Sequence, residues 1–112
     1  MQRELLLLRE MRDSATAILD LVEGRTADEI RVDSIRRAAV LWHFTVLEEA
    51  ASQVPDEIKS PHHDIAWRAA TRLRNRIVHS YWSIDLALLV DAAAEDLPTM
   101  IAGLEAAISG SE

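Results

Sequence analysis

The chain has 112 residues, a length typical of a single domain, so we expect one domain over residues 1–112. Hydrophobic residues make up 49% of it, but three glycines and three prolines provide too few turns for the hairpins of an all-β fold. The net charge of −7 excludes a general electrostatic attraction to nucleic acid or anionic lipid, and the absence of cysteine excludes disulfides and thiolate metal sites. No apolar run approaches the ~20 residues that span a bilayer, so we expect a cytoplasmic protein with no membrane partner.

The first helix is predicted from near residue 3 to Glu23, because apolar residues recur there at steps of three and four. Gly24 then gives a stop signal, and Thr26 followed by Glu29 matches a capping box at the start of the next helix. The apolar stripe of the first helix consists of Leu8, Met11, Ala15, Ile18 and Val22.

The second helix is predicted as one uninterrupted element that ends at about Val54, before Pro55. His43 is interpreted as a histidine at the edge of the core, and Glu48 and Glu49 as part of a solvated face. We expect a broad core-facing stripe made of Ile35, Ala39, Trp42, Val46 and Ala50, backed by Val40, Phe44, Leu47 and Ala51.

Two more helices are predicted in the second half of the chain. Residues 56–63 are interpreted as a connection with one short turn, and a third helix follows from Asp64 to about His79. The fourth helix begins near Asp85, and its apolar stripe keeps its phase through Pro98, which favours one kinked helix over two. The pattern therefore predicts an all-α fold, a four- to five-helix antiparallel bundle whose last helix is kinked at Pro98.

Positive charge is concentrated in one short segment. Residues 1–37 sum to −1, residues 38–67 to −4, residues 68–84 to +4 and residues 85–112 to −6. The simplest interpretation is a solvated basic face that pairs with the acidic last helix. Its four arginines are Arg68, Arg72, Arg74 and Arg76.

The helical phase of Arg74 argues against that interpretation. Arg74 falls only about 70° from the centre of the apolar face of the third helix, which consists of Ala66, Ala70, Leu73 and Ile77. Partial burial of a guanidinium at the edge of the core is unfavourable unless an anionic partner or a functional role compensates for the lost hydration. Arg74 and His79 would lie about 140° apart on an unbroken helix, so they converge only if the helix breaks or if two chains build one site.

The run from Arg74 to Trp82 resembles the signature of HEPN-domain proteins, and specifically of the HepT-like toxins. In that signature four residues separate an arginine, usually followed by asparagine, from a histidine, and a tyrosine follows two positions later. Arg74, Asn75, His79 and Tyr81 match it position by position. The resemblance covers roughly residues 26–108, and this chain departs from it at Glu48, where glycine is common, and at Arg72, where a small residue often stands.

The resemblance implies a HEPN-like domain that is a metal-independent endoribonuclease, the toxin of a prokaryotic type VII toxin–antitoxin pair. It also implies a homodimer whose two motifs face one cleft, and a minimal nucleotidyltransferase (MntA-like) antitoxin that transfers AMP to Tyr81. RNA carries its own nucleophile, the 2′-hydroxyl, so cleavage needs proton transfer and charge stabilisation but no cofactor. The implied catalytic pair is Arg74 and His79, with Asn75 and Arg76 in support and Arg68 and Arg72 binding RNA.

Other interpretations are weaker but stay open. His62, His63 and Asp64 could suggest a metal, yet adjacent histidines rarely both ligate, so no metal site is expected. The alternative functions are a non-catalytic HEPN module that binds RNA or a nucleotide, or serves as a scaffold for the nucleotidyltransferase, and a plain helical dimerisation protein. The Arg74 and His79 pair favours an enzyme, because a pure binder needs no titratable group there.

Overall fold

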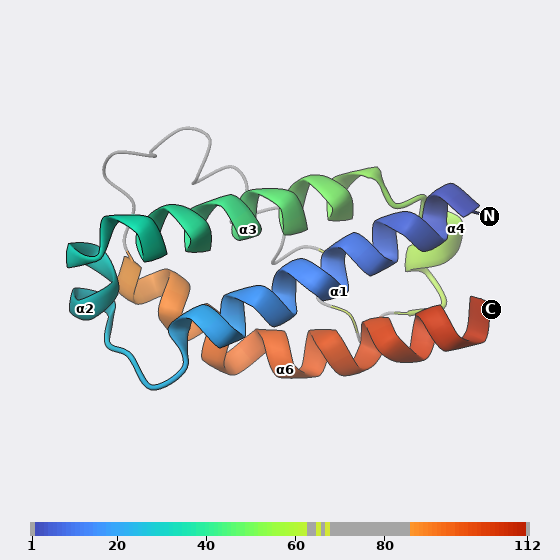
Figure 1. The fold of residues 1–112 in the computed structure, drawn as a ribbon. Helices are drawn as coiled ribbons and strands as arrows, with labels where there is room; N and C mark the ends of the chain where they lie inside the picture. The colour runs from blue at the N-terminus through green and yellow to red at the C-terminus, as the bar shows by residue number, and fades with distance from the viewer. Residues whose placement is uncertain (1, 63–64, 66, 68–85, 112) are drawn as a thin grey trace.

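The computed structural model describes residues 2–62, 65, 67 and 86–111, and every regular element within them is a helix. These helices are α1 (Gln2–Val22), α2 (Ala27–Val32), α3 (Ser34–Gln53), α4 (Asp56–Lys59) and α6 (Leu86–Ser111). α1 contacts both α3 and α6 and lies between them (Figure 1). The predicted all-α bundle is therefore confirmed.

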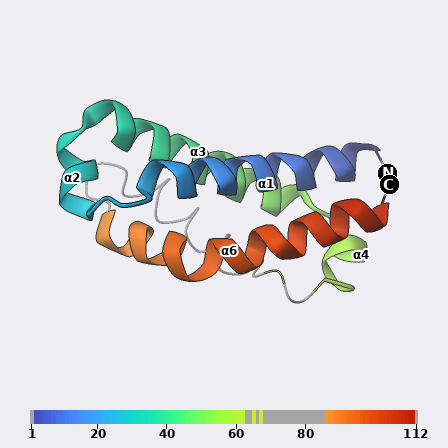
Figure 2. The same ribbon diagram turned by 60° about the horizontal axis from the view of Figure 1, so that its bottom comes forward.

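The three long helices are antiparallel to their neighbours. Arg3 near the start of α1 donates from Nη2 to Oε1 of Gln53 at the end of α3, at 2.8 Å. At the opposite end of the pair, Nη1 of Arg36 donates to the carbonyl oxygen of Leu21 at 3.0 Å. α6 runs back along α1, so the two chain ends lie at the same end of the bundle (Figure 2).

α1 ends where the sequence predicts. All five residues of its apolar stripe are buried, which confirms the predicted core face. Gly24 has a φ of +70°, a left-handed conformation that glycine adopts without a steric penalty. The capping box is also present, because Oγ1 of Thr26 accepts from the Glu29 N–H at 3.1 Å and Oε1 of Glu29 accepts from the Thr26 N–H at 2.9 Å.

The prediction of one uninterrupted second helix is wrong. The chain breaks at Asp33, whose backbone is extended, and α2 and α3 are separate elements. The cause is local, because Oδ1 of Asp33 accepts a hydrogen bond from the Arg36 N–H at 3.1 Å and so caps a new helix. α3 ends at Gln53 before Pro55, as predicted.

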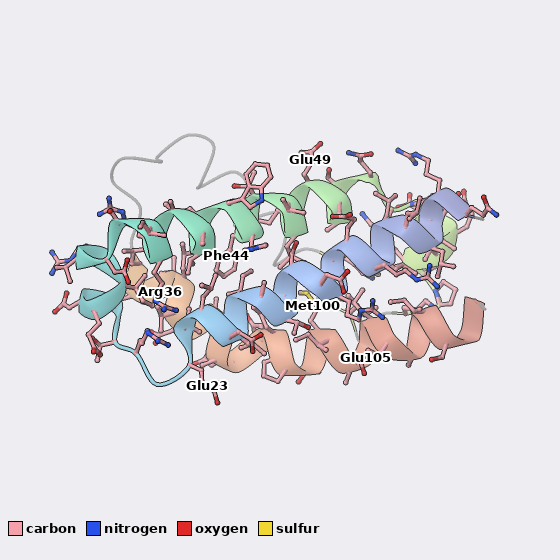
Figure 3. The ribbon with its side chains drawn as sticks, in the orientation of Figure 1. Glu23, Arg36, Phe44, Glu49, Met100 and Glu105 are labelled. Carbon is pink, nitrogen blue, oxygen red and sulfur yellow. The ribbon has the colours of Figure 1, made fainter. Side chains whose placement is uncertain are left out.

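The expected core-facing stripe of α3 is confirmed for Ala50 and for its backing residues Val40, Phe44, Leu47 and Ala51, which are buried, but its centre is displaced. Ile35 is 83% exposed and Trp42 is 63% exposed. Figure 3 shows Phe44 on the side of α3 that faces α1, and Phe44 is fully buried. The apolar residues that α3 buries are Val40, Leu41, Phe44, Leu47, Ala50 and Ala51.

The C-terminal part of the described chain follows the prediction. α4 forms the short turn expected after Pro55. α6 continues through Pro98 as one helix, and its path bends in both views (Figures 1 and 2). Leu89, Leu97 and Leu104 on its apolar stripe are buried, whereas Ile101 is half-buried and the neighbouring Met100 takes the inner position.

Candidate functional site

The residues that the sequence singles out for chemistry lie outside the described part of the chain. Arg68, Arg72, Arg74, Asn75, Arg76, His79 and Tyr81 all belong to residues 68–85, as does most of the predicted third helix. Their roles therefore stay predictions. The structure does describe the residues on either side of this segment and the helices that flank it.

The chain is packed into the bundle on both sides of residues 68–85. Ile65 and Leu86, on either side of the segment, are buried members of the core. Trp67 donates from Nε1 to the carbonyl oxygen of His62 at 3.1 Å, and Nζ of Lys59 lies 5.7 Å from the centre of the Trp67 ring. These contacts fix the entry to the segment through an aromatic anchor and a cation–π pair.

The two adjacent glutamates of α3 lie in opposite environments. Glu49 is exposed and points away from the bundle (Figure 3), where its carboxylate accepts from Nε2 of Gln53 at 3.2 Å. Glu48 is 0% exposed, so the expectation of a solvated face is correct for Glu49 and wrong for Glu48. Among the described residues, Glu48 is the one charged side chain that is fully buried.

Sequence reasoning missed Glu48, although the signal was present. Glu48 follows Phe44 by four positions and precedes Ala51 by three, so the three share a helix face. Once Phe44 is placed in the core, burial of Glu48 follows from the geometry of the helix. The expected stripe did include Phe44 and Ala51, but it was centred near Trp42 and Val46, and this centre put Glu48 on the solvated side of the helix.

The histidines of the described residues do not form a metal centre. His43 is half-buried at the core edge, as predicted, and its Nδ1 is buried with no hydrogen bond to the described residues. The backbone carbonyl of His62 receives the Trp67 indole, and His63 and Asp64 lie outside the described residues. Within residues 2–62, 65, 67 and 86–111, no three His, Asp or Glu side chains are grouped to hold a metal ion.

An open groove lies on the outer surface where α1 meets α3. Leu7 and Glu10 of α1 form one wall, and the wall from α3 includes Trp42, Val46 and Ala50. The lining of the groove is mostly apolar, and two carboxylates, those of Glu10 and Glu49, also belong to it. None of the helices described is long and apolar enough to span a bilayer.

Comparison with known proteins finds that the chain is similar to proteins named as ribonucleases. Residues 11–107 match a family model described as "Ribonuclease HepT-like". The "Probable ribonuclease HepT" of Thermococcus cleftensis is 29% identical over 94 residues, covering 80% of this chain and 84% of that protein. A relative from Methanocaldococcus jannaschii that carries RNase in its name is 26% identical over 106 residues, covering 95% of this chain and 84% of the relative. No solved structure matches the chain.

Proposed function

This chain belongs to the Ribonuclease HepT-like family, and we propose that it is an endoribonuclease that cleaves RNA without a metal ion. The observation that carries the proposal is that the family match spans the run in which Arg74, Asn75, His79 and Tyr81 stand at the spacing of the HEPN signature. The site is local, because four arginines gather in a chain whose overall charge is −7. The substrate is RNA, whose 2′-hydroxyl attacks the neighbouring phosphate.

Each residue of the run has a role that its chemistry suits. His79 transfers a proton to or from the reacting oxygens, since an imidazole titrates near neutral pH. Arg74 binds the non-bridging phosphate oxygens as negative charge grows on them. Asn75 and Arg76 support these two residues, and Arg68 and Arg72 bind the RNA backbone at a distance from the reacting bond.

A homodimer completes the site in this proposal. One chain supplies one motif histidine, whereas cleavage of RNA uses both a proton acceptor and a proton donor. Two copies whose motifs face one cleft supply both groups, and the cleft also removes the difficulty that Arg74 and His79 diverge on a single regular helix. Light scattering should show a dimer at micromolar concentration, and an active monomer would contradict this part of the proposal.

Two substitutions test the assignment of roles. His79→Ala and Arg74→Ala should each lower RNA cleavage by ~10²–10⁴-fold, while the circular dichroism of the helices is unchanged. Arg68→Ala is the matched control and should lose less activity. Cleavage should persist in EDTA and leave 2′,3′-cyclic phosphate ends. Full activity of His79→Ala, or complete loss on chelation, would refute the mechanism, and RNA binding without cleavage by the parent chain would favour the non-catalytic module.

Regulation by a partner enzyme is the last part of the proposal. The chain acts as the toxin of a toxin–antitoxin pair, and a minimal nucleotidyltransferase transfers AMP from ATP to the phenol oxygen of Tyr81 and releases pyrophosphate. A nucleotidyl phosphate two residues from His79 would occupy the groups that hold RNA and repel its backbone. Tyr81→Phe should therefore stay active and resist neutralisation. Intact-mass measurement after incubation with the partner and ATP should show the added mass on the parent chain only.

A further inference from the structure

The outward face of α3 carries a regular apolar stripe that is not buried in the bundle. Ile35, Ala39, Trp42 and Val46 recur at steps of three and four, the spacing of one helix face. Ile35 and Trp42 are mostly exposed, and Ala39 and Val46 are half-buried. A helix that is apolar on two opposite faces is typical of an element that is covered on both. The outward face of α3 is therefore a candidate contact surface.

The groove beside this stripe suits a protein side chain better than a small molecule. Its volume of about 260 Å³ lies below the ~300–1,000 Å³ that is typical of small-molecule pockets. It is also open to solvent and mostly apolar, with Leu7 on the α1 side and Val46 and Ala50 on the α3 side. A large apolar side chain from a neighbouring protein surface would fill it.

The same face carries a side chain of that kind. Trp42 projects at one end of the groove, and Ala50 lies eight residues further along α3, about 12 Å at 1.5 Å per residue. A twofold dimer requires this arrangement, because one patch must supply both sides of the interface. If two copies of α3 cross antiparallel near Thr45, each Trp42 meets the groove of the other copy between Val46 and Ala50.

The polar atoms of the two sides are complementary as well. The indole Nε1–H of Trp42 is a donor only, and an indole that becomes buried at an interface usually finds an acceptor. The groove offers one in the carboxylate of Glu10, on its α1 side. Glu49, on the α3 side, already accepts from Gln53. Glu10 of one copy is therefore the acceptor that fits Trp42 of the other.

We propose that two copies of this chain pair through the outward faces of α3, with each Trp42 seated in the groove of the other copy. α3 has 20 residues and is about 30 Å long, so its face together with that of α1 offers an area on the order of the ~800 Å² that each partner buries in a stable dimer. Tryptophan is among the residues that most often anchor such interfaces. The inference rests on the proposed function for the need of a dimer, and it names the surface that forms it.

The anchor is tested by the dissociation constant of the dimer, measured by analytical ultracentrifugation. Trp42→Ala should raise this constant at least ~10-fold, and Trp42→Phe, which keeps a ring but has no N–H donor, should fall between Trp42→Ala and the parent. Leu88→Ala is the matched control, because it removes an exposed apolar side chain from α6, and it should leave the constant unchanged. A monomeric parent chain, or a Trp42→Ala chain that dimerises as tightly as the parent, would overturn the proposal.

Folding of the single chain is separable from this association. Trp42 lies outside the core of its own chain, so Trp42→Ala should keep the circular dichroism of the parent. At concentrations at which the parent is dissociated, the two chains should also have nearly the same free energy of unfolding. A weaker dimer in a variant that is folded to this standard is a loss of the interface itself.

The crossing point of the two helices is tested by a chemical cross-link. The chain has no cysteine, so a single introduced thiol identifies one position. Thr45→Cys lies at the proposed crossing, and a short bis-maleimide should join two Thr45→Cys chains. Thr99→Cys, at an exposed position of α6, should stay unjoined. A dimeric Thr45→Cys variant that is not joined, or equal joining of Thr99→Cys, would overturn the pairing.

RNA cleavage distinguishes failure of this interface from failure of the proposed function. If both are correct, Trp42→Ala should lose cleavage on dilution and regain it at higher concentration. A parent chain that dimerises and cross-links as expected but cleaves no RNA would support the interface and refute the ribonuclease. A Trp42→Ala chain that is dimeric and fully active would refute the interface and leave the ribonuclease in place.

Discussion

Gly24 sets the path of the chain from α1 into α2 through its backbone conformation alone. Its φ is +70°, and a Cβ placed on it would meet no atom within 4 Å. A substitution there is therefore strained in the backbone and unhindered in space. We expect Gly24→Ala to lower the free energy of unfolding by about 1 kcal/mol, with a smaller loss for Gly24→Asn, since asparagine tolerates the left-handed region. Urea unfolding measures both, and equal losses would contradict the backbone explanation.

Glu29 gives α2 a dependence on pH. Its carboxylate accepts the backbone N–H of Thr26, and this hydrogen bond lowers the pKa of Glu29 from the ordinary value of 4.5. A folded pKa below the unfolded one means that the stabilisation is present above about pH 4.5 and disappears as the pH falls through the lowered folded value. The difference in urea midpoint between the parent and Glu29→Gln should therefore be largest at pH 7 and shrink at pH 3. A difference that is constant over this range would contradict the expectation.

The roles of some single residues could be predicted from the sequence and those of others could not, because some roles depend on near neighbours in the chain and others on distant helices. The roles of Gly24, Thr26 and Glu29 depend on neighbours within three or four positions, so the pattern contains the whole cause. Burial of Glu48 depends on which face of α3 meets the rest of the bundle, and this is decided by other helices. The sequence analysis therefore predicted the cap at Thr26 and missed the buried carboxylate, and it also missed the cap at Asp33 although that cap is local.

At the scale of the element, α3 carries two apolar stripes and the sequence does not say which of them packs. Ile35 and Trp42 form a regular stripe, and so do Leu41, Phe44 and Leu47. The second set is buried in the bundle, and Ile35 and Trp42 of the first set are left exposed. An apolar period of 3.6 residues identifies a helix. Which face of that helix turns toward the core is decided by the helices that pack against it.

A matched pair of aromatic residues tests this assignment of faces. Trp42 and Phe44 are two positions apart and lie about 160° apart around α3. Phe44→Ala should lower the free energy of unfolding by about 3–5 kcal/mol, because it leaves a cavity in the core. Trp42→Ala should change it by less than about 1 kcal/mol, since most of that side chain is exposed. Urea unfolding distinguishes the two, and the reverse order would show that the predicted face was correct.

At the scale of the whole molecule, charge separates the proposed site from the rest of the chain. The segment of residues 68–84 carries +4 within a protein of −7, and the last 28 residues carry −6. If the proposed function is correct, we expect RNA to be attracted to this segment and repelled by the acidic remainder of the chain. The residues of the proposed site could be named from the sequence because their motif is contiguous. Their three-dimensional arrangement stays a prediction, because residues 68–85 lie outside the described part of the chain and the proposed second chain is a further prediction.

A mixing experiment tests the proposed division of proton transfer between two copies. Parent chains and His79→Ala chains are refolded together, and exchange of subunits is checked by capture through a tag on the variant. If each cleft needs both histidines, an equal mixture leaves about a quarter of the dimers competent, so activity should fall to about a quarter of that of the same total amount of parent chain. If one histidine is enough, or if each chain works alone, half or more of the activity remains. Mixing with Glu49→Gln chains, in which only an exposed carboxylate of α3 changes, should leave full activity and shows that refolding itself is not the cause of the loss.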